Sequence, residues 1–226
     1  MIANSSQGRR CGMDINKKLV KQNFTKGRGG KKIEYLVIHD TGNEAPLAHA
    51  EAHFNYFNNE PRPASAHYFV DEKQILQIIE DENTAWHCGD GKGKYGITNS
   101  NSIGIEICIN DGDYTTEIAK TIELVRHLMQ KHNIPIENVV RHYDASRKNC
   151  PASMSANNWE AWKVFKKQLE PNTAATNKVK VNIKGKVIYL DGFMQNDINY
   201  VGIRQIVEAL GHNVGWDNDK KVVLIK

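Results

Sequence analysis

Three side chains of the kinds that bind transition metals stand at strand ends or in loops of the sequence. They are His39, His142 and Cys150. Catalytic zinc sites commonly use three protein ligands and leave a fourth position for water, and imidazole with thiolate suits zinc better than calcium or magnesium. The histidines are too far apart in sequence to match any short metal-binding motif, so their spacing alone is weak support for a zinc centre.

The same residue types also allow a second chemistry. A thiol hydrolase would use Cys150 as the nucleophile and His142 as its base. Cys88 and Cys108 are expected to be buried apolar side chains. His49 and His53 are four residues apart, but His-Ala-Glu-Ala-His is not the His-Glu-x-x-His motif, so we expect them to be surface histidines.

Two strands are expected to bring the histidines to a common edge. Residues 33–39 form an apolar run that ends at His39 before an Asp-Thr-Gly turn, and residues 138–142 form a short strand that ends at His142. In residues 102–110 the isoleucines alternate with other residues, which places Glu106 on the face away from them.

The remaining segments predict helices and a hairpin around these strands. Helices are expected with Pro46 in the first turn and an end at residues 58–59, from residue 115 or 116 to 132 with a threonine cap, and over 158–169. Residues 67–71 and 75–80 are expected to form a hairpin. Residues 89–101 are glycine-rich and predict a surface loop near the site. Strands alternating with helices imply an α/β domain, with a mixed central β-sheet flanked by helices.

The composition changes after residue 170. Residues 171–178 are expected to be a linker, and residues 179–226 a small C-terminal module with a β-hairpin, a helix and a final strand. Residues 13–170 form the expected catalytic domain. Residues 1–12 are interpreted as a leader or an added extension, and they have no apolar core of the kind found in a secretory signal.

The overall composition is that of an ordinary globular protein. The formal charge is +4, from 30 Lys+Arg against 26 Asp+Glu, a weak bias toward anionic partners such as a cell wall. The C-terminal module has too small a basic excess to suggest a nucleic-acid partner. No apolar run approaches the ~20 residues that membrane insertion needs.

Five segments, in this order, resemble the type-2 N-acetylmuramoyl-L-alanine amidases, a family that includes phage endolysins and peptidoglycan recognition proteins. They are VIHDTG, SAHYFVD, TAWHCG, NSIGIEICIN and VRHYDASRKNCPA, within residues 15–170. The resemblance implies the fold of this family and a zinc enzyme that hydrolyses the amide bond between the lactyl group of MurNAc and L-alanine in peptidoglycan.

The resemblance also assigns individual residues. It implies zinc ligands at His39, His142 and Cys150, a catalytic glutamate at Glu106 and a catalytic lysine at Lys148. Glu106 would move the proton of the attacking water, and Lys148 would stabilise the oxyanion. The substrate-groove histidine of the family matches His87. His67 is expected to line the zinc pocket and contact substrate, to orient a metal ligand, or simply to pack as a core residue.

Several functions remain open at this point. A phage or prophage endolysin, made in the cytoplasm without a signal peptide and acting on the wall after holin-dependent release or from outside, is favoured over a non-catalytic peptidoglycan-recognition protein, because such proteins typically lack the third ligand. Residues 200–223 resemble the small module named after the N-terminal domain of copper amine oxidases. We expect this module to bind the cell wall, with a spacer or dimerisation role as the alternative.

Overall fold

The computed structural model describes residues 14–110, 114–170, 177–183, 185–195, 198–217 and 222–225. The chain divides into two compact units, residues 1–170 and residues 171–226. The expected extension at residues 1–12 lies outside the described residues, as does most of the expected linker. Strand β9 already begins at Asn177, inside the range expected for the linker.

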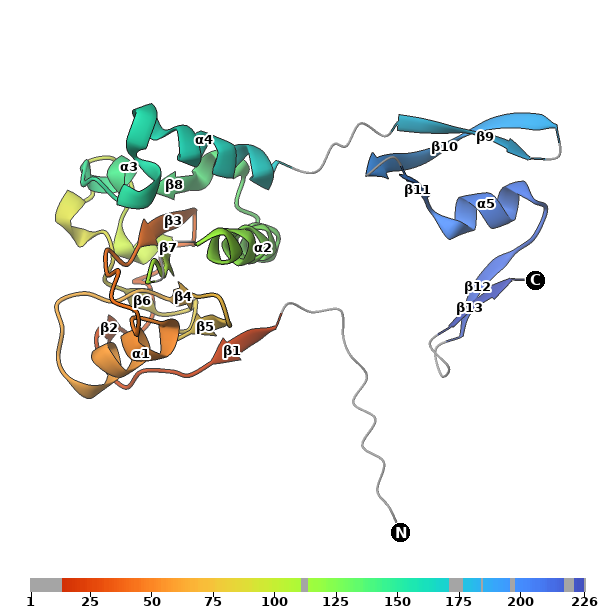
Figure 1. Ribbon diagram of the computed structural model, residues 1–226. Helices are drawn as coiled ribbons and strands as arrows, with labels where there is room; N and C mark the ends of the chain where they lie inside the picture. Colours follow the sequence, from red (N-terminus) through yellow and green to blue (C-terminus); the bar gives the residue numbers. More distant parts are fainter. Residues whose placement is uncertain are drawn as a thin grey trace, which may run out of the picture. The chain divides into compact units, whose positions relative to one another are not determined.

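The first unit is built on a six-stranded sheet. Across the sheet the strands are β1 (Ile15–Lys17), β5 (Ile75–Gln77), β4 (Tyr68–Val70), β7 (Ser102–Ile107), β3 (Tyr35–Asp40) and β8 (Val139–Arg141) (Figure 1). The β4–β5 hairpin is antiparallel and every other neighbouring pair in this sheet is parallel. A separate two-stranded ribbon joins β2 (Phe24–Thr25) to β6 (Thr84–Ala85). The predicted mixed sheet is confirmed.

Helices flank this sheet (Figure 1). They are α1 (Ala50–Asn59), α2 (Thr115–His132), α3 (His142–Ser146) and α4 (Ala156–Leu169), with short 3-10 turns η1 (Gly89–Gly91), η2 (Asn99–Asn101), η3 (Ile136–Asn138) and η4 (Ala152–Met154). The threonine cap predicted for α2 is wrong, because its N-cap is Tyr114 and no side chain caps the helix there. Among the described residues, no helix has the length and apolarity to span a membrane.

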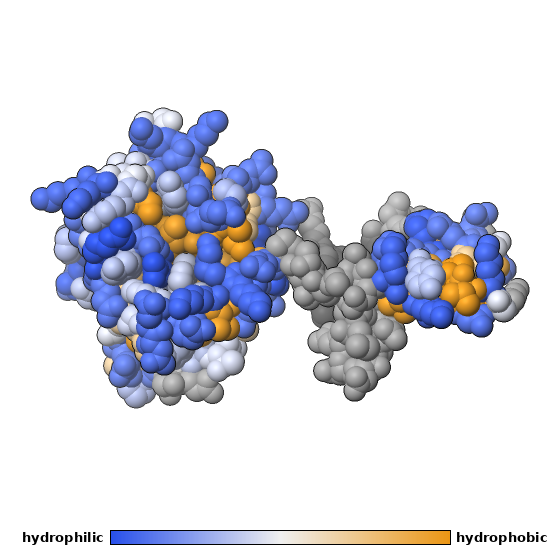
Figure 2. All heavy atoms as spheres, turned by 90° about the horizontal axis from the view of Figure 1, so that it is seen from above, coloured by the Kyte–Doolittle hydropathy of each residue, from blue (hydrophilic) through white to orange (hydrophobic). Residues whose placement is uncertain are grey.

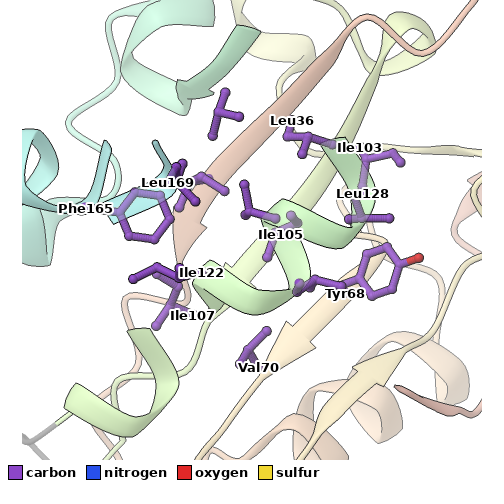
Figure 3. Close-up of a cluster of buried hydrophobic side chains, with 14 of the residues drawn as sticks. Leu36, Tyr68, Val70, Ile103, Ile105, Ile107, Ile122, Leu128, Phe165 and Leu169 are labelled. Carbon is purple, nitrogen blue, oxygen red and sulfur yellow. The ribbon is translucent and has the colours of Figure 1, made fainter. Parts of the chain in front are cut away.

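The alternation along β7 divides the two faces of the sheet as predicted. Ile103, Ile105 and Ile107 pack into the main core with residues of α2 and α4, such as Leu128 and Phe165 (Figure 3). These side chains are almost completely buried. Because each strand turns its next residue to the other face, Glu106 leaves this core and projects to the opposite side.

That opposite face carries both smaller apolar clusters and the polar site. Val37 lies beside Gly104 in the parallel pairing of β3 and β7, and His39 lies beside Glu106. On the other side of β7, Phe69 of β4 pairs with Glu106 and packs with Phe54 of α1. The sheet therefore sets His39 and Glu106 next to each other on a rigid support.

The second unit contains a three-stranded sheet in the order β11 (Ile198–Val201), β10 (Lys186–Gln195) and β9 (Asn177–Ile183). Helix α5 (Ile203–Ala209) follows, and β12 (Val214–Asp217) pairs antiparallel with β13 (Val222–Ile225). The predicted hairpin around residues 184–185, the helix and the last strand are all present. The visible face of this unit has a hydrophobic patch among hydrophilic residues (Figure 2), and its exposed apolar residues include Val187, Tyr189, Ile203 and Leu210.

Candidate metal centre

Three neighbouring parallel strands deliver polar side chains to one edge of the sheet. His39 and Glu106 lie near the carboxyl ends of β3 and β7, and His142 is the first residue after β8. In sheets of this type, functional sites form beyond the carboxyl ends of the strands. His142 begins the short helix α3, so the predicted strand ends one residue earlier than expected.

His39, His142 and Cys150 converge at this edge. One potential ligand atom from each lies within 4.8 Å of the other two. The distance from Cys150 Sγ to His39 Nδ1 is 3.6 Å, and the two imidazole rings have centroids 4.7 Å apart. All three side chains are buried. The fold thus brings together the three residues that the sequence analysis selected as metal ligands.

Contacts on the outer side of each imidazole orient the inner nitrogen toward this cluster. His142 Nε2 lies 2.8 Å from Asp90 Oδ1, and His39 Nε2 lies 3.1 Å from His87 Nδ1. Within the described part of the chain, the buried Nδ1 of His142 has no hydrogen-bond partner. A buried nitrogen without a partner is costly unless a cation binds it, so this donor set fits a metal ion.

Electrostatics support the same reading. Burial is the main cause that lowers the pKa of His39 well below its usual value, and burial also lowers the pKa of His142. Both imidazoles are therefore neutral near pH 7, which is the form that binds metals. Burial raises the pKa of the Cys150 thiol to about 12, so it needs a neighbouring cation to become a thiolate.

Glu106 lies beside the cluster. Its Oε1 is 3.9 Å from His39 Nδ1, and its buried Oε2 makes no hydrogen bond with the residues that the structure describes. Burial, and then the carboxylate of Asp40, raise the pKa of Glu106 to about 8, whereas Lys148 acts in the opposite direction. A carboxyl group of this pKa can exchange a proton near neutral pH.

Two cavities adjoin the centre. A cavity of about 270 Å³ is lined by residues that include His87, Asp90, His142, Lys148 and Trp86. A larger one of about 1040 Å³ is lined by residues that include Asp40, Ala152, Ser153, His49 and Glu72. Lys148 is exposed at the first cavity and its charge acts on both imidazoles and on Glu106.

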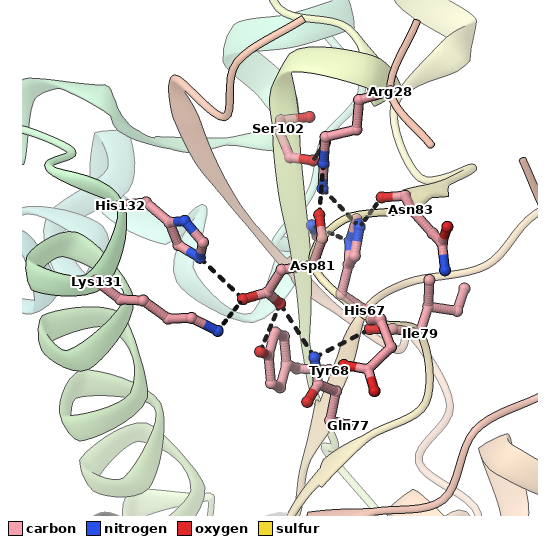
Figure 4. A network of polar contacts seen from close by, with 12 residues as sticks. Arg28, His67, Tyr68, Gln77, Ile79, Asp81, Asn83, Ser102, Lys131 and His132 are labelled. Carbon is pink, nitrogen blue, oxygen red and sulfur yellow. Dashed lines mark hydrogen bonds and ion pairs between the residues drawn. The ribbon is translucent and has the colours of Figure 1, made fainter. Parts of the chain in front are cut away.

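His67 occupies a structural position instead of the substrate-contacting one considered for it. It is fully buried, and its Nδ1 accepts a hydrogen bond from the Gly104 N–H. Its Nε2 lies 3.2 Å from the Asn83 carbonyl oxygen and 3.0 Å from Arg28 Nη2 (Figure 4). Burial lowers its pKa to about 3. Since both ring nitrogens are engaged by the backbone, the structure supports the core assignment for His67.

The predicted surface histidines are partly buried. The ring of His53 stacks on Phe69, and His49 lies 3.3 Å from Glu72. His49, Asp71 and Glu72 also form a group with metal-ligand spacing. The oxygens of Asp71, however, accept hydrogen bonds from the backbone N–H groups of residues 50, 73 and 74. We therefore interpret Asp71 as a structural residue that stabilises the turn after β4 and the start of α1.

Two residues of the centre were missed by the sequence analysis. Asp90 lies in the glycine-rich loop, which was expected near the site without any residue being selected. Ser102, at the start of β7, lies 3.1 Å from His87 Nε2. A lone aspartate in a loop and a serine at a strand start carry no short-range signal, and only tertiary contact with a histidine gives them a role.

Comparison with known proteins identifies the family. The family model for N-acetylmuramoyl-L-alanine amidase (Amidase_2) matches residues 29–153, more than half of the chain. The chain is 40% identical over 130 residues to the N-acetylmuramoyl-L-alanine amidase XlyA of Bacillus subtilis (strain 168), covering 57% of this chain and 42% of XlyA. It is 39% identical over 121 residues to CwlH of the same strain, another N-acetylmuramoyl-L-alanine amidase, covering 53% of this chain and 48% of CwlH.

A solved structure agrees in fold. A mutant endolysin from Bacillus subtilis superposes with a TM-score of 0.61 and 36% identity, covering 70% of this chain and 99% of that one. The chain spans less than half the length of the two curated relatives. The family match includes all three clustered residues, His39, His142 and Cys150. The chain belongs to the N-acetylmuramoyl-L-alanine amidase family.

Proposed function

We propose that the protein is a zinc-dependent N-acetylmuramoyl-L-alanine amidase of the phage or prophage endolysin type. It hydrolyses the amide bond between the lactyl group of MurNAc and L-alanine in bacterial peptidoglycan. The observation that carries this proposal is the convergence of His39, His142 and Cys150 beside Glu106, in a chain of this family. The enzyme acts on the cell wall after holin-dependent release from the cytoplasm, or from outside the cell.

The metal in this proposal is zinc, held by His39, His142 and Cys150. Two imidazoles and one thiolate form a donor set typical of zinc, and three protein ligands leave a position open. Bound there, zinc would supply the Lewis acidity that polarises the substrate carbonyl and lowers the pKa of water. The unpartnered Nδ1 of His142 in the described structure supports this ligand set.

Glu106 and Lys148 carry the proposed catalytic roles. Glu106 takes a proton from the attacking water as its oxygen adds to the carbonyl carbon, and returns it to the nitrogen of L-alanine as the carbon–nitrogen bond breaks. The ammonium group of Lys148 stabilises the developing oxyanion. His87 borders the smaller cavity and is proposed to face the substrate there.

The thiol-hydrolase alternative is less well supported. A nucleophilic cysteine needs a lowered pKa and a base in hydrogen-bond contact. Burial instead raises the pKa of Cys150 to about 12, and its sulfur contacts His39, not the expected base His142, at 3.6 Å. A non-catalytic recognition protein would have no use for three converging ligands. The zinc amidase is therefore our conclusion.

Digestion of purified peptidoglycan tests the proposal. We expect the wild-type chain to release peptides with a free N-terminal alanine, seen by mass spectrometry, and to contain about one zinc per chain, as a single three-ligand site requires. Cys150→Ser should lose both zinc and hydrolysis. Hydrolysis that survives in Cys150→Ser, or that withstands complete metal removal, would refute the zinc mechanism. Reducing sugar ends without free alanine would refute the assigned bond.

For the second unit we propose cell-wall binding by residues 179–226, joined to the catalytic unit by a linker. Its exposed apolar side chains support a role in contact with another molecule. The alternative is that a second copy of the chain covers this surface in a dimer. Co-sedimentation of the chain with insoluble peptidoglycan tests wall binding, and the mass of the chain in solution tests dimerisation.

A further inference from the structure

A line of buried hydrogen bonds leads away from the metal-binding side of His39. His39 Nε2 lies 3.1 Å from His87 Nδ1, and His87 Nε2 lies 3.1 Å from Ser102 Oγ. The Ser102 hydroxyl in turn donates to the Thr98 carbonyl oxygen at 2.5 Å. The residues of this line are at most 8% exposed, apart from the Thr98 backbone that ends it, so bulk water does not compete for the contacts.

The chemistry of the last acceptor fixes the direction of every bond in the line. A carbonyl oxygen can only accept, so the Ser102 proton points at Thr98 and the Ser102 oxygen is free to accept from His87 Nε2–H. A neutral imidazole with its proton on Nε2 accepts at Nδ1. His87 therefore accepts from His39 Nε2–H, and the lone pair of His39 lies on Nδ1, which faces Cys150.

The packing around His87 leaves its ring little freedom. A Cβ atom on Gly104 of β7 would lie 2.5 Å from His87 Cγ, which is closer than real atoms approach. Any other residue at this position would therefore displace the His87 ring. Gly104 pairs with Val37 in the sheet, two residues before His39. The paired strands β3 and β7 therefore carry both His39 and the glycine that His87 packs against.

We propose that His87 and Ser102 are positioning residues that fix the ring orientation and the protonated nitrogen of His39. Their line of neutral groups does for His39 what the Asp90 carboxylate does for His142. This inference rests on the metal-binding part of the proposed function, and it gives His87 a role that does not depend on contact with substrate. Partners of this kind hold a metal-binding imidazole in the productive tautomer.

The difference between the two imidazoles has a physical consequence. A carboxylate partner adds a negative charge near the metal and makes its imidazole a stronger donor, whereas a line that ends at a backbone carbonyl adds none. His87 and Ser102 therefore orient His39 without reducing the Lewis acidity of the ion. Breaking the line should weaken metal binding while leaving the charge of the site unchanged.

The test compares two substitutions of matched size. His87→Asn keeps an acceptor oxygen at the position of Nδ1, and His87→Leu removes it. Zinc affinity is measured by competition with a chromophoric chelator, and the Co²⁺ form gives the absorption spectrum of the site. We expect His87→Leu to bind zinc about 10- to 100-fold more weakly and to have an altered cobalt spectrum, with both properties largely restored in His87→Asn.

Ser102→Ala provides a milder change one bond farther out, with a smaller loss of affinity in the same direction. His127→Leu, at an exposed histidine of α2, is the control and should bind zinc as the wild type does. In wild-type protein without metal, ¹⁵N NMR should find the shared proton on His39 Nε2. Thermal unfolding checks that each variant is folded.

The outcomes separate this inference from the proposed function. A wild-type chain that binds no zinc would overturn both. If wild type binds zinc and folded His87→Leu binds it equally well, the positioning role is wrong and the amidase proposal stands. Equal losses in His87→Asn and His87→Leu, or a proton found on His87 Nδ1, would also reject the positioning role, because they would mean that packing alone matters or that the line runs the other way.

Discussion

Glu106 lies beside the proposed ligand His39 on the side of the ring that faces the metal cluster. Its Oε1 is 3.9 Å from His39 Nδ1 and the side chain is 18% exposed. Glu106→Gln keeps the shape but cannot take a proton. We expect hydrolysis to fall by about 10²- to 10⁴-fold with zinc content unchanged, measured by peptide release and metal analysis. Full activity in this variant would mean that another group moves the proton.

Asp90 is expected to act through His142. Its Oδ1 lies 2.8 Å from His142 Nε2, and Asp90→Ala would leave that ring nitrogen without its partner. Loss of such a partner typically weakens metal affinity by about 10- to 100-fold. Asp90→Asn keeps an acceptor oxygen and should lose less.

A chelator competition measures the effect of both Asp90 substitutions, with Lys92, in the same loop, changed to alanine as a control. Lys92 lies in the left-handed region at the end of η1 and outside the cavity that contains Asp90. If both Asp90 variants bind zinc like the wild type, the contact seen in the structure does not help to hold the metal.

Single residues were predictable where their type restricts their chemistry. His39, His142 and Cys150 are soft ligand types at strand ends or in adjoining loops, so type and position made them candidates, and the family resemblance assigned them as ligands. Asp90 and Ser102 could not be selected, because aspartate and serine are common in loops and at strand starts. The role of His67 could not be resolved, since its partners are backbone groups and the Arg28 side chain, all from distant segments.

Helix α2 is tied to the β4–β5 hairpin by one buried carboxylate. Asp81 is 1% exposed, pairs with Lys131 and His132 near the end of α2, and accepts hydrogen bonds from Tyr68 and Gln77 (Figure 4). Burial opposes ionisation of Asp81, but the hydrogen bonds from Lys131, Tyr68 and His132 outweigh it and lower its pKa from 3.8 to about 2. The fold thus stabilises the ionised carboxylate.

This shift makes a stability prediction. The contribution of Asp81 is present above the unfolded pKa near 4 and is lost as the pH falls toward 2. From the size of the shift it is on the order of 2 kcal/mol. Asp81→Asn should lower the free energy of unfolding at pH 7 and flatten its dependence between pH 4 and 2, as measured by urea unfolding. An unchanged acid slope would show that other carboxylates dominate.

Elements were predictable where a regular pattern spans many residues. The alternation of isoleucines in residues 103–109 determined which face of β7 packs into the main core, and the apolar spacing of α2 determined its extent. The ends were harder, because a cap depends on a few local contacts. Thr115 suits an N-cap by type, yet the helix begins after Tyr114 without a side-chain cap.

The strand order across the whole sheet could not be derived from local patterns. β3 lies between β7 and β8, which come from segments more than sixty residues later in the chain. This parallel arrangement is what brings His39 to Glu106 and His142. Only the resemblance to a family, with its five segments in order, connected these residues before the structure did.

Removing residues 171–226 tests the independence of the two units. The three apolar clusters of the first unit lie within residues 15–169, and the superposed endolysin chain is 99% covered by 70% of this one. We therefore expect residues 1–170 to fold in a single transition and to hydrolyse soluble muropeptides at the full-length rate, because every proposed ligand and catalytic group is retained.

On insoluble peptidoglycan, a wall-binding role of the second unit predicts that the shortened chain binds less and clears the peptidoglycan more slowly at low enzyme concentration. Binding assays by co-sedimentation and turbidity measurements report the two effects. Equal binding by both chains would exclude a wall-binding role for the second unit, and unchanged clearing together with a loss of dimer mass would favour the dimerisation alternative.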